Sequence, residues 1–234
     1  KIQHDAFDLT VDAKLISHLY LDEIEDAMNH FDLQVQYGAE LGNALAQALD
    51  CNLAQLAALA ARHPARVPGG VGGSVLRHNA YGTDAEPLAH GLFDAAVIFD
   101  EKNIPEGKRY CFLRPRYYSL LKRNLELINK ISGGSGSLSD SNGLEIAGFT
   151  MVKSNNVPNT EVTNSYKNKY DGDFTDTIAV CMTEDAIASV QLKDLAIQTA
   201  DDHNRQATFV AAKFTMGHGV KRPDCAVEIN RKVG

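Results

Sequence analysis

The sequence predicts an α+β protein with two domains, one of them discontinuous. Apolar residues partly alternate over residues 5–19, which is typical of a strand, and a single apolar stripe then continues over residues 22–61, which is typical of one long helix. After a mixed middle segment, strand-like runs return at residues 205–216 and 226–233. Because a lone strand and helix cannot bury enough surface, we expect the two ends of the chain to pack together with the middle inserted between them.

Composition and charge narrow the class of protein. The 234 residues are 44% hydrophobic and 23% charged, which excludes a disordered or collagen-like chain. The 23 Lys and Arg against 30 Asp and Glu give a formal net charge of −7, so the overall field repels phosphate, although a local basic patch is not excluded. No uninterrupted apolar run approaches the roughly 20 residues of a membrane helix, so no membrane partner is expected. Four dispersed cysteines are expected to be reduced thiols: Cys51, Cys111, Cys181 and Cys225.

The sequence contains signals for the start and the end of the long helix. Asp22 is a candidate N-cap, and Glu25 stands three residues on, as in a capping box. Apolar or small residues then follow at alternating steps of three and four as far as Ala60, and His63-Pro64 ends the helix. At about 1.5 Å per residue, such a helix is about 60 Å long, with a bend expected at Gly38 or Gly42.

The rest of the chain alternates short elements with loops. Residues 64–83 and 127–142 are predicted to be Gly-rich connections, residues 154–176 a long polar loop or hairpin, and Gly148 a bulge. The predicted helices are 84–102 and 115–123, and the predicted strands are 108–113, 144–152, 178–183, 188–192, 205–216 and 226–233.

Candidate nucleotide and metal sites are weak. The Gly-rich stretches at 69–74 and 133–137 lack the Lys-Ser/Thr of a P-loop or a GxGxxG opening into a helix, so flexible turns are expected. Asp171, Asp173 and Asp176 have calcium-like spacing, but Met182 stands where an EF-hand loop needs a bidentate Glu. A solvated acidic turn is the better interpretation, with opportunistic cation binding between subunits left open.

Candidate catalytic groups are equally unspecific. No nucleophile motif occurs, and the carboxylates at Asp22, Glu23, Glu25 and Asp26 are better explained as compensation of the helix dipole than as an acid–base pair. The densest basic stretch, residues 108–123 with interleaved tyrosines, suits a subunit interface better than nucleic-acid contact in so acidic a chain. No catalytic residue, cofactor-binding residue, metal ligand or cofactor is therefore expected.

Two stretches carry a family resemblance. They are IEDAMNHFD at Ile24–Asp32 and AAKFTMGHGVKRPDCAV at Ala211–Val227. With them, the chain resembles the major capsid proteins of T7-like short-tailed bacteriophages (podoviruses) over nearly its whole length, although residues 63–83 and 124–176 match only in outline. Within the second stretch, Gly217, His218 and Gly219 are expected to form a tight backbone passage with a structural role for His218.

The resemblance implies the HK97-like capsid fold, with a long spine helix, an elongated peripheral sheet and an inserted axial domain. By this mapping, residues 1–83 and 200–234 are the two parts of the peripheral domain and residues 84–199 are the axial domain. The loops at 132–143 and 154–176 become candidates for tips at the capsomer axis or between capsomers. The family also has an N-terminal arm and an extended hairpin loop, which are expected to precede Lys1.

The implied function is structural rather than enzymatic. Such a protein self-assembles, as hexamers and pentamers, into the icosahedral shell that encloses the double-stranded DNA genome of a tailed bacteriophage. The implied partners are a scaffolding protein, the portal and a decoration or minor capsid protein, with DNA enclosed but not bound sequence-specifically. The implied location is the virion capsid, assembled in the bacterial host cytoplasm. An encapsulin-like cargo compartment is the main alternative, and a small-molecule-binding enzyme is a remote one.

Overall fold

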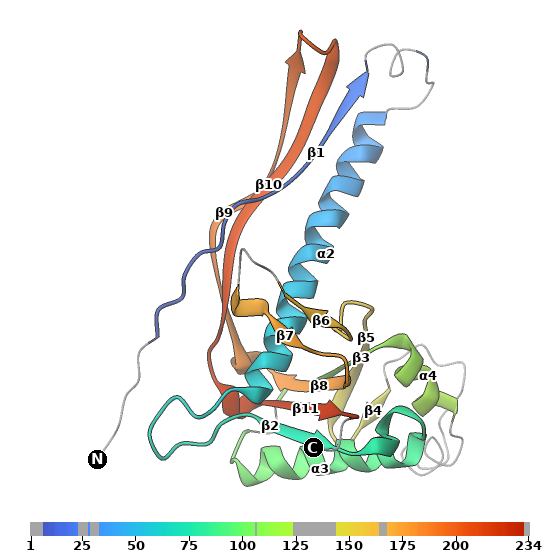
Figure 1. Ribbon diagram of the computed structural model, residues 1–234, viewed down its shortest axis with the longest axis vertical. Coiled ribbons are helices and arrows are strands. Elements are labelled where there is room, and N and C mark those ends of the chain that lie inside the picture. The colour runs from blue at the N-terminus through green and yellow to red at the C-terminus, as the bar shows by residue number, and fades with distance from the viewer. Residues whose placement is uncertain are drawn as a thin grey trace. The chain divides into compact units, whose positions relative to one another are not determined.

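A computed structural model of the chain describes residues 7–22, 28, 33–105, 107–123, 144–163 and 168–231 (Figure 1). Its helices are α2 (Leu33–Arg62), α3 (Ala85–Glu101) and α4 (Pro115–Arg123). Its longer strands are β1 (Leu15–Asp22), β2 (Ser74–Arg77), β3 (Arg109–Leu113), β5 (Phe149–Lys153), β8 (Thr177–Thr183), β9 (Ile187–Asp202), β10 (Ala207–Val220) and β11 (Ala226–Asn230). Short strands β4 (Glu145–Ile146), β6 (Glu161–Val162) and β7 (Gly172–Asp173) and 3-10 turns at Asn79–Gly82, Asn168–Tyr170, Glu184–Ala186 and Pro223–Cys225 complete it.

The chain divides into two compact units. The three-stranded unit comprises residues 8–50 and 189–219, and the six-stranded unit comprises residues 1–7, 51–188 and 220–234. This division differs from the boundaries expected at 83/84 and 199/200. The reason is that β2 and β11, expected in the peripheral domain, are hydrogen-bonded into the same sheet as β3, β5 and β8. The assignment of residues 1–83, 84–199 and 200–234 to peripheral and axial roles stays a prediction.

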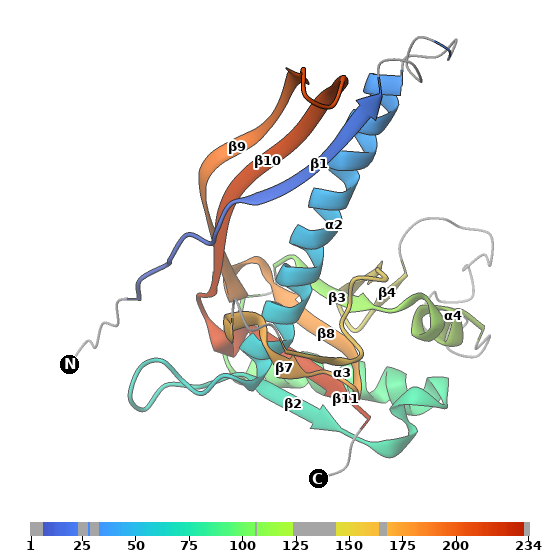
Figure 2. The ribbon, with the colours of Figure 1, turned by 45° about the horizontal axis from the view of Figure 1, so that its top comes forward.

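The three-stranded unit is a sheet of order β1-β10-β9 with one face covered by helix (Figure 2). β1 pairs antiparallel with β10 from Leu15 opposite Phe214 to Asp22 opposite Ala207. Leu41 and Leu45 of α2 lie in one buried cluster with Val210, Ala212 and Phe214 of β10. These contacts explain the three-and-four spacing, since positions four apart lie on one helix face.

Residues before β1 follow a different course from the strand expected over 5–19. A Cβ atom at Gly217 would lie 2.3 Å from the carbonyl oxygen of Thr10, and one at Gly219 would lie 2.5 Å from Cδ1 of Leu9. Because Cβ atoms stand out from the face of a sheet, the chain at residues 9–10 crosses the face of β10 and does not pair with its edge. The strand therefore starts only at Leu15. The close backbone passage expected here is confirmed at Gly217, whereas the close neighbour of Gly219 is the side chain of Leu9.

The six-stranded unit is a mixed sheet of order β2-β11-β8-β3-β5-β4. β2 is parallel to β11, β3 is parallel to β5, and the other neighbours are antiparallel. α3 packs four fully buried side chains into the core of this unit: Leu88, Leu92, Ala95 and Phe99. Leu121 of α4 and Leu56 of α2 join the same cluster, so the three amphipathic patterns share one core.

Two predictions of local structure were wrong, and two strands are longer than predicted. β2 lies inside the predicted connection 64–83, because its four residues become a strand only by pairing with β11, far along the chain. Gly148 is not a bulge but part of a two-residue turn with Ala147, both at positive φ (77° and 52°), that joins β4 to β5. The two strands predicted at 188–192 and 205–216 are present as β9 and β10 of one long hairpin, but both are longer than predicted, since β9 ends at Asp202 and β10 at Val220.

Other predictions are confirmed or lie outside the described residues. The helices at 84–102 and 115–123 and the strand at 108–113 are α3, α4 and β3. Residues 154–176 include the small antiparallel hairpin β6–β7. Glu25 of the capping box, the loop 127–142 and all of Ile24–Asp32 except Met28 lie outside the described residues.

By length and composition alone, residues Val35–Arg62 of α2 could cross a membrane, with a mean hydropathy of 1.2 in the most apolar window. The buried central helix of a non-membrane protein satisfies the same criterion. In α2, Leu41 and Leu45 pack on β10, whereas Leu56 and Ala60 pack in the core of the six-stranded unit. The protein itself therefore covers much of the apolar stripe.

Candidate assembly surfaces

The side chains considered for catalysis or metal binding do not come together at one site. Among the described residues, no group of three or more His, Cys, Asp or Glu could hold a metal ion. Oδ1 of Asp173 accepts hydrogen bonds from the backbone N–H and the hydroxyl of Thr175, while Oδ1 of Asp176 accepts from Arg231 at 2.8 Å. Two of the three carboxylates with calcium-like spacing are thus committed to separate partners. Of the four acidic residues in the first turn of the expected helix, only Asp22 is described, at the end of β1.

His218 lies inside the three-stranded unit. Its side chain is 3% exposed, and Nδ1 shares a hydrogen bond of 2.8 Å with Oγ of Ser189, which ties β10 to β9. The two flanking glycines let residues 9–10 pass over this part of β10. This geometry supports the structural role expected for His218.

The basic stretch 108–123 separates into two parts with different surroundings. Arg109 is 6% exposed; it donates to Oδ1 of Asp100 at 2.8 Å and to the carbonyl of Ile104 at 3.0 Å, which fixes β3 to the end of α3. Arg116 and Arg123 are exposed on α4 and line a cavity of about 240 Å³ together with Tyr117 and Leu120. The second part is thus available for contact with another molecule.

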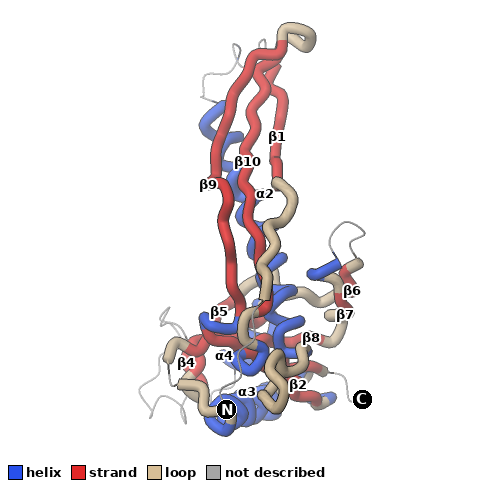
Figure 3. Tube along the Cα trace, turned by 90° about the vertical axis from the view of Figure 1, so that its left-hand side faces the viewer, coloured by secondary structure: helices blue, strands red, loops and turns tan. Residues whose placement is uncertain are grey.

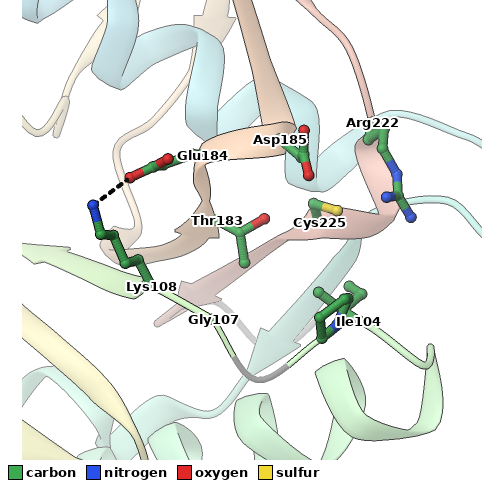
Figure 4. Close-up of a pocket in the computed structure, with 9 residues that line it drawn as sticks. Ile104, Gly107, Lys108, Thr183, Glu184, Asp185, Arg222 and Cys225 are labelled. Carbon is green, nitrogen blue, oxygen red and sulfur yellow. Dashed lines mark ion pairs between the residues drawn. The ribbon is translucent and has the colours of Figure 1, made fainter.

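A second cavity, of about 200 Å³, lies where the residues before β3 meet the 3-10 turns after β8 and β10 (Figure 4). Its charged side chains are already paired: Lys108 with Glu184 at 3.6 Å, Lys221 with Asp185 at 2.6 Å and Arg222 with Asp224 at 2.6 Å. The thiol of Cys225 also lines it, and burial raises its pKa, so the thiol is not poised as a nucleophile. The charged side chains at this cavity are therefore paired with one another, and the cavity is not a reactive site.

All four cysteines are free thiols, and two of them face each other. Cys111 of β3 stands directly opposite Cys181 of β8, and both are fully buried. Burial and the neighbouring thiol raise the pKa of Cys111 well above its ordinary value, so it is protonated. The two thiols contribute to the packing of the core.

Strand β9 lies at an edge of its three-stranded sheet (Figure 3), and it carries exposed apolar side chains. Every residue from Gln191 to Asp201 is exposed, including Leu192 at 66%, Leu195 at 54% and Ile197 at 55%. An edge strand of this kind presents unpaired backbone N–H and C=O groups along its length. Proteins normally shorten or cover such an edge, so this one is a candidate contact for another chain.

A buried ion pair, not anticipated from the sequence, anchors the C-terminal end of α2 within the six-stranded unit. Glu228 of β11 is fully buried, and its carboxylate accepts from Nε and Nη2 of Arg62 at 2.6 and 2.7 Å. The hydroxyl of Thr177 donates to the same carboxylate at 2.6 Å, and Nη1 of Arg62 donates to the carbonyl of Asp173 at 2.6 Å. The hydrogen bonds that Arg62 donates to Glu228 raise the pKa of Arg62, so the guanidinium stays charged.

Known proteins similar to this chain are capsid proteins. The family model described as "Gp10A-like: Major capsid protein" matches residues 8–230. The chain is 28% identical to the major capsid protein of Escherichia phage T7, over 99% of this chain and 75% of that protein, and 26% identical to that of Enterobacteria phage T3, over 96% and 73%. Among solved structures, the capsid of the cyanophage P-SCSP1u superposes with a TM-score of 0.86 at 31% identity, over 98% of this chain and 77% of that one.

These similarities agree with the architecture described above: a long helix on a three-stranded sheet and a six-stranded mixed unit. They confirm the expected HK97-like capsid fold and the resemblance to T7-like phages. The chain belongs to the Gp10A-like family of major capsid proteins and is a major capsid protein of a tailed bacteriophage.

Proposed function

We propose that copies of this major capsid protein associate as hexamers and pentamers and close an icosahedral shell around the double-stranded DNA genome of the phage. Membership of the Gp10A-like family over residues 8–230 supports self-assembly into a shell, as in the related capsids. The same membership argues for a structural protein over an enzyme, and for a phage shell over an encapsulin-like compartment.

The exposed edge of β9 is the observation that best supports an assembly role. Its backbone groups can pair with an extended segment of a second copy, and Leu195 and Ile197 on one face would then be covered. Lys193 and Asp194 are the only charges between Ala188 and Asp201, so little charge has to be desolvated when the strand is covered. Contacts of this kind, repeated around each ring, supply shell strength without a large interface in any one place.

The charge of the chain suits the enclosure of DNA. A formal net charge of −7 repels the phosphate backbone, so the shell would enclose the genome without binding it tightly or sequence-specifically. In this proposal the protein is a component of the virion capsid and is assembled in the bacterial cytoplasm. A scaffolding protein acts during assembly, the portal occupies one vertex, and a decoration or minor capsid protein is a further partner. No cofactor, metal or membrane takes part.

Charge placed on the β9 edge tests the proposal. The double substitution Leu195→Lys/Ile197→Lys should lower the yield of sedimenting shells at least about tenfold, because two buried lysines cost several kcal/mol at each contact. The matched control is Val71→Lys, which places one lysine at an apolar residue that is 57% exposed in the six-stranded unit. Shells seen by electron microscopy for the wild type and the control, and their loss in the double variant, support the proposal. A wild-type protein that stays monomeric contradicts it.

A further inference from the structure

We infer that the exposed face of α3 in one copy docks on the α4 cavity of the next copy, in a head-to-tail contact that repeats around the capsomer. The inference rests on the proposed assembly into rings and names the surfaces that meet. It comes from two helices of the six-stranded unit whose exposed faces carry opposite charges.

The outer face of α3 is acidic with an apolar centre. Between Ala85 and Glu101 the helix has four carboxylates and no Lys or Arg. Phe93 and Val97, one turn apart, are 45% and 53% exposed, and the exposed Asp94 and Glu101 flank Val97. We call Phe93, Asp94, Val97 and Glu101 the α3 face.

The outer face of α4 is basic and hollow. Between Pro115 and Arg123 the helix has three Lys or Arg and no acidic residue. Arg116 and Arg123 are exposed, neither forms an ion pair with another described residue, and both line the cavity of about 240 Å³ with Tyr117, Leu120 and Thr83. We call this the α4 cavity.

The two surfaces match in spacing. Asp94 and Glu101 are seven residues apart, as are Arg116 and Arg123, so each pair spans about 10.5 Å on one side of its helix. Val97 lies between the two carboxylates and Leu120 between the two guanidinium groups. Two helices packed along these faces would form two ion pairs on either side of an apolar contact.

The cavity also has room for an aromatic ring. A cavity of about 150 Å³ in a protein core can hold benzene, and the α4 cavity measures about 240 Å³. Phe93 is adjacent to Asp94, so its ring would reach the cavity beside Tyr117 when the ion pairs form. Aromatic anchors that fill a pocket, ringed by charges, are typical of the centre of an interface.

The partner is a second copy because one copy cannot make this contact with itself. α3 and α4 bury their other faces in the same core through Leu92 and Leu121, so their exposed faces point away from that core. The two surfaces differ, and a contact between different surfaces of identical chains generates a ring when the rotation closes. The proposed shell is built from repeated copies of this chain, which provides the required neighbours.

Charge reversal tests the contact. Asp94→Arg/Glu101→Arg and, separately, Arg116→Glu/Arg123→Glu should each lower shell yield at least about tenfold, because like charges would meet at every contact. The variant with all four substitutions should recover shells, since opposite charges meet again. An equimolar mixture of the two reversed proteins should recover hexameric rings but not pentamers, because the two kinds of chain can alternate only around an even-numbered ring.

Cross-linking provides a second test that does not depend on yield. Val97→Cys/Leu120→Cys shells treated with a thiol oxidant should give a ladder of linked chains that stops at five or six. Dimers alone, or no linked chains from intact shells, would overturn the inference and leave the proposed function standing. Shells that form normally with reversed α4 charges but hold less DNA would also overturn it, in favour of nucleic-acid contact. Failure of the wild type to form shells would instead refute the proposed function.

Discussion

Arg62 at the end of α2 and Glu228 in β11 form a double hydrogen-bonded ion pair, with Nε 2.6 Å from Oε2 and Nη2 2.7 Å from Oε1. The carboxylate is fully buried, whereas the Arg62 side chain is 27% exposed. The guanidinium also stacks 5.1 Å from the ring centre of Phe174. One side chain thus links the end of the long helix to β7, β8 and β11 of the six-stranded unit.

Breaking this pair should destabilise the protein strongly. Glu228→Ala leaves a charged Arg62 without its main partner and should lower the free energy of unfolding by about 3 kcal/mol, measured by urea unfolding of the soluble protein. The paired substitution Arg62→Met/Glu228→Leu should recover most of that loss, because both charges are removed together. The control is Arg231→Met, which breaks the exposed pair with Asp176 and should cost less than about 1 kcal/mol. Equal losses for Glu228→Ala and Arg231→Met would contradict this account.

A side chain at Gly217 should prevent the chain from crossing β10. Gly217→Val places a Cβ 2.3 Å from the backbone oxygen of Thr10, whereas Gly219→Val meets Cδ1 of Leu9, the end of a flexible side chain. We therefore expect Gly217→Val to abolish shells in electron micrographs and Gly219→Val to reduce them less. Gly38→Val is the control, because nothing lies within 4 Å of the corresponding Cβ position. Normal particle yield for Gly217→Val would refute the close passage.

A charge in the α2 stripe should destabilise the three-stranded unit. Leu45 is 5% exposed and lies in one cluster with Val210 and Phe214, so Leu45→Asp should lower the free energy of unfolding by more than about 3 kcal/mol. Ala44→Asp on the exposed side of the same helix should cost less than about 1 kcal/mol, mainly through helix propensity. Urea unfolding of the two soluble variants makes the comparison. Similar urea midpoints for the two variants would mean that the apolar stripe of α2 does not pack on β10 as described.

The ion pair between Asp185 and Lys221 should make a pH-dependent contribution. The hydrogen bond from Lys221, at 2.6 Å, lowers the pKa of Asp185. The folded protein therefore binds this proton less readily than the unfolded chain. The contribution is complete above the unfolded value of about 3.9 and is lost as the pH falls through the lower folded value. The melting temperature of Asp185→Asn should thus lie below that of the wild type at pH 7.

The difference in melting temperature between Asp185→Asn and the wild type should disappear as the pH falls below about 4. Lys221→Met, which removes the cation responsible for the lowered pKa, should show the same pattern. Thermal unfolding of the purified proteins measures this difference. If the difference in melting temperature between the wild type and Asp185→Asn stays constant from pH 7 to pH 3, the lowered pKa of Asp185 has no role in stability.

The elements that were predictable from the sequence are those specified by local patterns. α3 shows its apolar face through Leu88, Leu92 and Phe99, and Pro115 marks the start of α4, so both helices were predicted within about two residues. β2 was missed because pairing with β11, far along the chain, makes it a strand. The outer half of β9 was missed because its pairing with β10 in the hairpin, rather than local alternation, makes it a strand.

The candidate surfaces were only partly predictable. The basic stretch near α4 could be found in the sequence, but its division into a buried Arg109 and exposed Arg116 and Arg123 depends on packing. The pairing of Arg62 with Glu228 joins residues 166 positions apart, a contact that no local pattern specifies. The glycines around His218 suggested a close passage, but only the fold identifies Thr10 as the segment that crosses there.

Electron cryo-microscopy of particles formed by the full-length protein tests the central claim most directly. The account predicts closed icosahedral shells with fivefold and sixfold capsomers. The β1-β10-β9 sheet with the first half of α2, and the six-stranded unit, should each fit the density of every subunit. A protein that remains monomeric at high concentration, or that forms particles whose subunit density cannot hold these two units, would contradict it.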